Sequence, residues 1–131
     1  VHETAHQWFY AMVGDSQAED AWLDEAFATY AEQLVDNTPP APADLRLRGP
    51  VDRPTADYGA DEEDYYRLTY GKGAAALRAA RDAAGPTAFD AAIRCYVNAN
   101  AWRIAEPSDL ANALRDLPAA LSVLRTAGAL R

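Results

Sequence analysis

The fold class of this 131-residue chain is decided by the stretch Trp22-Leu23-Asp24-Glu25-Ala26-Phe27-Ala28-Thr29-Tyr30. Its apolar side chains recur every three or four residues and continue to Leu34, which is the spacing of one helix face. We expect Asp20 to cap this helix and Asn37 to end it. A long helix with one apolar face has to pack against other helices, so the stretch predicts a helical core.

Helix start and stop signals flank this stretch on both sides. Residues 1–13 are expected to form a first helix, which Gly14 ends as a left-handed cap. A third helix is expected over residues 62–84, with a break near Gly71 and Gly73. Glycine and proline then mark the later helices, with Gly85-Pro86 before a fourth, Pro107 opening a fifth and Pro118 a sixth.

Residues 38–60 interrupt the helical pattern. They hold five prolines and little periodicity, so we expect a long irregular loop that lies over other parts of the structure. Trp8, Trp22 and Phe27 are expected to form core between the first two helices, and Cys95 to be a buried small apolar residue. The chain therefore predicts a single all-α domain of about six helices with one long proline-rich loop.

Composition favours the same class and excludes several kinds of protein. The chain has 30 alanines but only 8 valines and isoleucines together, and alanine favours helices whereas β-branched residues favour strands. A net charge of −8 argues against a nucleic-acid partner, which would need a basic surface. No apolar run approaches the roughly 20 residues of a membrane span, and no charged-then-apolar signal segment opens the chain. The compartment is left open.

The charge is unevenly distributed along the chain. Residues 1–66 carry 15 acidic and 3 basic side chains, whereas residues 67–131 carry 5 acidic and 9 basic ones. Any site in the first half therefore lies in a negative field.

Both histidines of the chain lie in the segment His2-Glu3-Thr4-Ala5-His6. On a helix, residues four apart differ by about 40° in direction and about 6 Å in rise, so both imidazoles can face one metal ion. Glu3 is turned by about 100° from His2, which keeps it out of the ligand set but near a water on the metal. That is where a general base belongs, so the spacing predicts a zinc site with a catalytic glutamate.

A catalytic zinc usually takes three protein ligands, so the two histidines need a partner. Eighteen residues separate His6 from Glu25, which lies near the start of the second helix. If the second helix packs antiparallel to the first, Glu25 can present its carboxylate to the same ion. Thr29, one turn further on the same face, is then placed to orient a ligand side chain.

These residues resemble the zinc aminopeptidases of the gluzincin clan, which include membrane alanyl aminopeptidase and leukotriene hydrolase. The family pattern is His-Glu-x-x-His, then eighteen residues, then Glu, with surroundings like His-Gln-Trp-Phe and Trp-Leu-Asn-Glu-Gly-Phe-Ala. The chain has His6-Gln7-Trp8-Phe9 and residues 22–28 in the matching places. Tyr70-Gly71-Lys72-Gly73-Ala74 looks like the family's later Tyr-Glu-Lys-Gly-Ala element.

The resemblance implies that residues 1–131 are the helical subdomain of a thermolysin-like zinc peptidase catalytic domain. By that resemblance His2, His6 and Glu25 bind one zinc per chain, Glu3 activates the water, and Tyr70 supports the oxyanion of the tetrahedral intermediate. The implied substrate is a peptide with a free N-terminus, from which N-terminal residues are removed. The β-rich part of the catalytic domain, which chooses among substrates, is expected upstream of Val1 and absent from this chain.

A second hypothesis is a non-catalytic helical fragment or scaffold that retains a zinc site. A ligand helix starting at Val1 lacks a preceding turn, and an apolar face meant for the upstream half is free for self-association. On this hypothesis the 131 residues alone have weak or no peptidase activity.

Simpler interpretations stand beside the functional ones for three further features. Tyr70 can be a half-buried tyrosine bonded to backbone, and Lys72 a solvated side chain. The acidic run at residues 61–64 is most simply a solvated helix start, and a role in binding a substrate ammonium group is the alternative.

Overall fold

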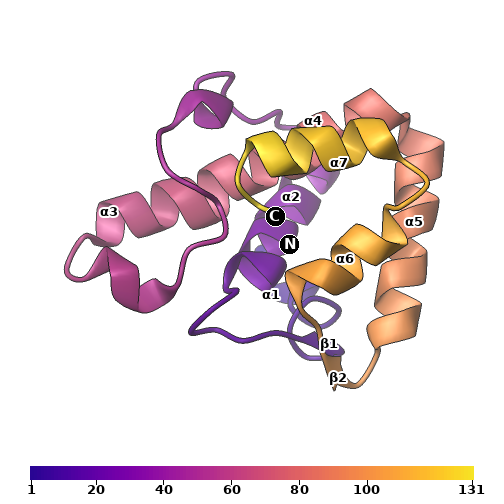
Figure 1. Ribbon diagram of the computed structural model, residues 1–131, viewed down its shortest axis with the longest axis horizontal. Helices are drawn as coiled ribbons and strands as arrows, with labels where there is room; N and C mark the ends of the chain where they lie inside the picture. The colour runs from indigo at the N-terminus through magenta and orange to yellow at the C-terminus, as the bar shows by residue number, and fades with distance from the viewer.

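The protein is predominantly α-helical, as the sequence predicts, and the computed structural model describes residues 1–131 (Figure 1). The α-helices are α1 (His2–Ala5), α2 (Trp22–Val35), α3 (Glu62–Tyr65), α4 (Gly73–Ala84), α5 (Pro86–Asn100), α6 (Pro107–Ala113) and α7 (Pro118–Thr126). A π-helical segment (Tyr66–Lys72) joins α3 to α4. These three follow one another without a gap, so the expected helix over residues 62–84 is confirmed and the chain has six helices in all.

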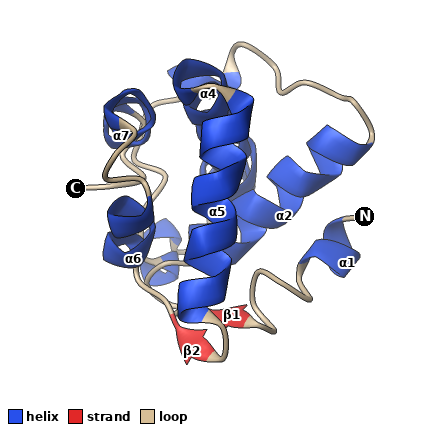
Figure 2. Ribbon diagram, turned by 90° about the vertical axis from the view of Figure 1, so that its right-hand side faces the viewer, coloured by secondary structure: helices blue, strands red, loops and turns tan.

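The first helix is much shorter than expected, because it ends at Ala5 rather than near Val13. Turns follow it, and Tyr10 has a φ of 113°, which a right-handed helix excludes. Gly14 does not cap a helix but lies in strand β1 (Val13–Gly14), which pairs in parallel with β2 (Arg103–Ile104). The two strands form the lower edge of the molecule in Figure 2.

The core lies where α4 packs against α2 and α7, and α5 packs against α4 and α6 (Figures 1 and 2). The largest fully buried side chains include Trp22 and Phe27 of α2 and Leu77 of α4. Gly73 lets α4 approach α2 closely, because a Cβ at this position would lie 2.6 Å from the Cβ of Ala26. Close packing through small residues therefore accounts for the abundance of alanine.

Three expectations about single side chains are wrong. Asp20 does not cap α2, whose N-cap residue is Ala21 without a side-chain hydrogen bond. Trp8 is 49% exposed, and it is Phe9 that stacks on Phe27, with ring centroids 4.5 Å apart. Cys95 is exposed on α5 rather than buried. Self-association through exposed apolar side chains stays a prediction.

The loop over residues 38–60 contains two 3₁₀ turns, Asp44–Arg46 and Thr55–Tyr58, and is otherwise irregular, as its prolines predict. It lies over the end of α7, where the Val51 N–H donates to the Ala127 carbonyl at 3.2 Å. Lys72, the only lysine, is buried rather than solvated, and its ammonium donates to the Gly49 carbonyl at 2.5 Å. Contacts with the end of α7 and with Lys72 thus hold the loop in place.

The helices are too short or too polar for a lipid bilayer, and none of them meets the requirements of a membrane span.

Candidate metal centre

Helix α2 fixes the position of Glu25 because its opposite face is buried in the core. Trp22, Ala26, Phe27 and Tyr30 are all buried, which sets the rotation of the helix about its axis. Glu25 lies in the first turn, where a carboxylate is favoured by the helix dipole. Its side chain is 16% exposed and is directed toward α1.

Helix α1 packs against α2 and carries His2, and His6 is the residue that directly follows its last turn. The rings of His2 and His6 meet edge to face, with centroids 4.8 Å apart. Each Nε2 lies 3.4 Å from the same oxygen, Oε2 of Glu25. One donor atom from each of the three residues lies within 4.8 Å of the other two, so the structure brings the three expected ligands together.

The three donors fit a zinc ion in their chemistry, and the two separations to the Glu25 oxygen fit it in spacing. Zinc takes imidazole nitrogens and carboxylate oxygens at about 2.0–2.2 Å in a tetrahedron, which places neighbouring donors about 3.4 Å apart. The two nitrogen–oxygen separations in the cluster are 3.4 Å each. Three protein ligands also leave one tetrahedral position for water or substrate.

Glu3 and Thr29 lie outside this ligand cluster. Glu3 is exposed on α1, next to His2 along the chain. The Thr29 hydroxyl donates to the backbone carbonyl of Glu25 at 2.8 Å. Thr29 therefore contacts the helix backbone at Glu25, and its role in orienting a ligand side chain stays a prediction.

Tyr70 reaches the cluster from the π-helical segment. Its ring stacks on the ring of His2, with centroids 6.0 Å apart and planes at 9°. Burial, followed by the nearby Glu25 carboxylate, raises the pKa of the Tyr70 hydroxyl above its usual range. The hydroxyl therefore stays protonated near neutral pH and is able to donate a hydrogen bond.

A buried polar group lies behind His6. Gln17 donates its side-chain N–H to Oδ2 of Asp24 at 2.6 Å, and that oxygen lies 3.8 Å from Nδ1 of His6. Burial, and then repulsion from Asp15, raise the pKa of Asp24 to about 7. At neutral pH the carboxyl group is therefore partly protonated, which reduces the negative charge behind the histidine.

Sequence reasoning missed two residues that the structure places beside the cluster. The Tyr65 ring meets the Tyr70 ring with centroids 5.8 Å apart, and Oε2 of Glu32 lies 3.7 Å from Nδ1 of His2. The helical period gave a signal for Glu32, because a residue two turns after Glu25 returns to the same face of α2. For Tyr65 there was no such signal, since only the π-helical geometry brings residues five apart onto one face.

The acidic run at residues 61–64 is a helix start, as the simpler interpretation predicts. Asp61 caps α3 by accepting the Asp64 N–H at 3.0 Å, and residues 61–63 are exposed.

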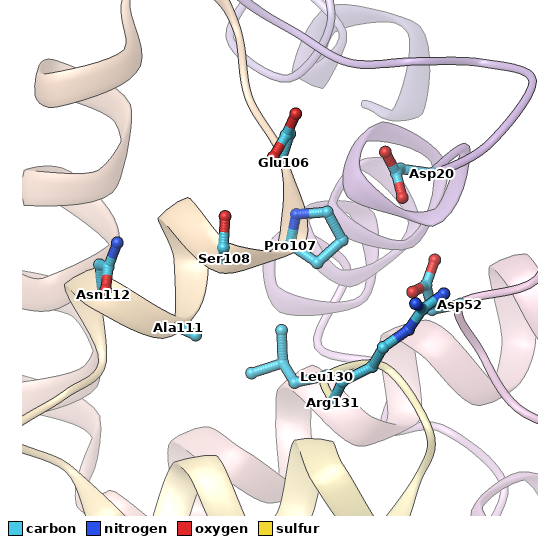
Figure 3. A pocket seen from close by; sticks show the side chains of 9 residues that line it. All are labelled: Asp20, Asp52, Glu106, Pro107, Ser108, Ala111, Asn112, Leu130 and Arg131. Atoms are coloured by element: carbon cyan, nitrogen blue, oxygen red, sulfur yellow. The ribbon is translucent and has the colours of Figure 1, made fainter.

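A separate acidic cavity of about 400 Å³ lies where α6 starts near the residues preceding α2 (Figure 3). Its lining includes Asp20, Asp52 and Glu106, with the Arg131 guanidinium next to Asp52. None of the residues of the histidine cluster lines it. Burial, followed by repulsion from Asp52, raises the pKa of Asp20 to about 6.

The helical fold together with the cluster of two histidines and one glutamate defines the class of the chain, which is the helical part of a zinc metallopeptidase domain. Residues 1–126 match the domain of peptidase family M1. The chain belongs to this family.

Similar proteins include several with aminopeptidase names. The chain is 31% identical over 134 residues to tricorn protease-interacting factor F2 of Thermoplasma acidophilum, covering 88% of this chain and 17% of that protein. It is 29% identical over 130 residues to human endoplasmic reticulum aminopeptidase 2, covering 86% of this chain and 14% of that protein. The chain thus spans about a sixth of the length of the curated relatives it matches.

Solved structures agree with this assignment. A zinc metallopeptidase of family M1 from Deinococcus radiodurans superposes with a TM-score of 0.71 at 29% sequence identity, covering 97% of this chain and 31% of that one. A variant of that enzyme bound to a Tyr-Ser-Ala substrate also gives a TM-score of 0.71, at 28% identity over the same share of each chain.

Proposed function

We propose that this protein hydrolyses peptide bonds with the help of zinc and removes N-terminal residues from peptides. The observation that carries the proposal is the convergence of donor atoms from His2, His6 and Glu25, with both imidazole nitrogens at zinc donor spacing from the same Glu25 oxygen. Membership of peptidase family M1 supports it, as do the aminopeptidase relatives and the peptide bound to the Deinococcus neighbour.

In this proposal His2, His6 and Glu25 together hold one zinc ion per chain. Bound there, zinc polarises the scissile carbonyl and lowers the pKa of water. The ligand side chains are 16–21% exposed, so they are shielded from bulk water yet open on one side to a substrate.

Glu3 serves as the general base. Its carboxylate takes a proton from the attacking water and passes it to the nitrogen of the leaving amine. Because Glu3 is exposed and adjoins His2 on α1, both water and substrate can reach it without displacing a ligand.

Tyr70 stabilises the oxyanion that develops on the scissile carbonyl oxygen. Its hydroxyl stays neutral because its pKa is raised, so it donates a hydrogen bond near neutral pH. A well-placed donor of this kind is worth about 3 kcal/mol of transition-state stabilisation.

The charge of the first half favours a substrate with a free amino terminus. Residues 1–66 carry 15 acidic and only 3 basic side chains, and all the residues that hold the metal lie among them. A negative field of this kind attracts both a dication and the ammonium group of a peptide.

The test is exchange of Glu3 for Gln in the full-length protein, with hydrolysis of an aminoacyl amide and zinc content measured side by side. Loss of a general base should lower the rate by about 10²- to 10⁴-fold, while one zinc per chain is retained. Exchange of His6 for Ala should instead remove the zinc. Glu19→Gln is the matched control, since Glu19 is an exposed glutamate outside the cluster.

Undiminished hydrolysis by the Glu3 variant contradicts the role of this residue as the base. Zinc binding without any hydrolysis by the unaltered protein favours the scaffold hypothesis instead. If the His6→Ala variant keeps its zinc, the proposed metal centre is contradicted.

A further inference from the structure

The two histidines differ in what their outer ring nitrogens contact. Both direct Nε2 toward Glu25, which leaves each Nδ1 as the group that sets the orientation of its ring. A metal-binding histidine usually donates its second N–H to an acceptor, which fixes its tautomer and makes it a better ligand. The nature of that acceptor therefore bears directly on how well each histidine binds.

His6 has a backbone acceptor supplied by its own segment. Its Nδ1 lies 3.2 Å from the carbonyl oxygen of Phe9, and Phe9 is anchored by stacking on Phe27 of the core. Oδ2 of Asp24 also lies near this nitrogen, at 3.8 Å, but the Phe9 carbonyl is nearer and no side-chain substitution removes it.

His2 faces a candidate side-chain acceptor on the neighbouring helix. Its Nδ1 faces Oε2 of Glu32 at 3.7 Å, which is an ion-pair distance. Glu32 lies two turns beyond Glu25 on α2, so the two carboxylates approach opposite nitrogens of the same ring from one helix face. Because 44% of the Glu32 side chain is exposed, rotation about its own bonds can bring the carboxylate to hydrogen-bond length.

The helix that carries His2 provides little orientation by itself. It ends at Ala5, which is its only buried residue. The position of the His2 ring therefore depends on contacts with other elements. The stacked Tyr70 ring fixes the plane of the imidazole, but stacking does not select which nitrogen carries the proton.

We propose that Glu32 is a positioning residue for the metal centre, accepting the Nδ1–H of His2 so that the unprotonated Nε2 is presented to zinc. The inference rests on the proposed function only in taking His2 as a zinc ligand. Glu32 does not touch the metal or the substrate, and it acts through His2 alone.

The experiment compares Glu32→Ala, Glu32→Gln and Asp36→Asn with the unaltered full-length protein. Zinc affinity is measured by competition with a chromophoric chelator, and the ring nitrogens of both histidines are observed by ¹⁵N NMR. Glu32→Ala should weaken zinc binding by about 10- to 100-fold, and Glu32→Gln by less, because its amide oxygen can still accept the hydrogen bond. Asp36, which is exposed at the end of α2, controls for the loss of one negative charge on the same helix.

The NMR readout separates positioning from a general structural effect. In Glu32→Ala without metal, the His2 ring should shift toward a mixture of tautomers, whereas the His6 ring keeps its spectrum. Zinc affinity of Glu32→Ala within threefold of the unaltered protein overturns the inference, and so does a loss matched by Asp36→Asn. Failure of the unaltered protein to bind zinc at all overturns the metal centre itself, together with this inference.

Discussion

Helices α1 and α2 both carry proposed ligands of the candidate metal centre, but they are held by different means. Helix α2 has fourteen residues, and seven of them are buried in the core. Helix α1 has four residues, of which only Ala5 is buried. The difference indicates that α2 holds its half of the proposed centre in place, whereas α1 is held by its contacts with α2.

This division has a consequence for metal binding. A site whose halves differ in stability is completed when the weaker half docks, so we expect metal binding and ordering of α1 to be thermodynamically coupled. The His2 and His6 rings contact Glu25, Tyr70 and Phe9, all of which lie outside α1. A bound metal ion would add one more contact between the histidines and residues outside α1.

Removing a core side chain from α2 should have the largest effect on stability. Phe27 is fully buried and stacks on Phe9 and Tyr96, so Phe27→Ala should lower the free energy of unfolding by about 3–5 kcal/mol. Phe9→Ala should cost less, because Phe9 is only partly buried. Denaturant unfolding of both variants measures the difference. An equal loss of unfolding free energy in both would contradict the view that α2 is held more firmly than the segment around α1.

Zinc should stabilise α1 by the next largest amount. At a free zinc concentration of 100 times Kd, zinc binding should stabilise the metal-bound conformation by about 2.7 kcal/mol. Amides whose hydrogen exchange requires local opening with loss of the metal should then exchange about 100-fold more slowly. The amides of Ala5 and His6, which donate to Val1 and His2, report on α1. Without zinc they should exchange far faster than the amides in the middle of α2.

The control for this measurement is His6→Ala, in which zinc should no longer slow exchange in α1. Amide protection in α1 equal to that in α2 before zinc is added would contradict the view that α1 is the weaker half.

Widening the contact between α2 and α4 should have a smaller effect. In Gly73→Ala the new Cβ would meet the Ala26 Cβ at 2.6 Å, so one helix has to shift. Overpacking of this kind costs about 1–3 kcal/mol. Because α2 carries Glu25, the shift should also weaken zinc binding, whereas Gly71→Ala, whose nearest neighbour is a backbone oxygen at 4.0 Å, serves as the control. Unchanged unfolding and zinc affinity in Gly73→Ala would show that α2 is less rigid than its burial indicates.

Much of the fold follows from local signals in the sequence. The prolines at positions 86, 107 and 118 each start a helix where the pattern predicts one, because a missing N–H costs nothing in a first helical turn. The apolar stripe of α2 predicts the core helix and the direction of Glu25, since burial on one face fixes the other.

What could not be predicted depends on contacts between distant segments. Residues 6–13 have helical spacing, but the pairing of β1 with β2 and the positive φ of Tyr10 bring the chain out of a helix. The sequence around Lys72 is equally consistent with a surface residue. Its burial depends on a hydrogen bond from its ammonium group to the Gly49 carbonyl, 23 residues away. The contact between Glu32 and His2 likewise needs the docking of α1 on α2.

The smallest predicted effect concerns the start of α2, where Asp20 lines the acidic cavity instead of capping the helix (Figure 3). Burial and repulsion from Asp52 raise the pKa of Asp20 to about 6, above the roughly 3.9 of an unfolded aspartate. Between these values the folded chain holds a proton that the unfolded chain has released, so the contribution of Asp20 to stability is present below about pH 4 and is lost as the pH rises through about 6.

Asp20→Asn should therefore reduce the fall in stability between pH 4.5 and 7, by no more than about 1 kcal/mol, because the side chain is partly exposed. Asp36→Asn, at the exposed other end of α2, is the control for the loss of one carboxylate. Unfolding by urea at the two pH values measures both variants. Zinc affinity should be the same in Asp20→Asn as in the unaltered protein, since Asp20 precedes α2 and lines a cavity that none of His2, His6 and Glu25 lines. A change in zinc affinity would mean that a substitution before the start of α2 alters the position of Glu25. The position of α2 would then be less firmly fixed than its burial suggests.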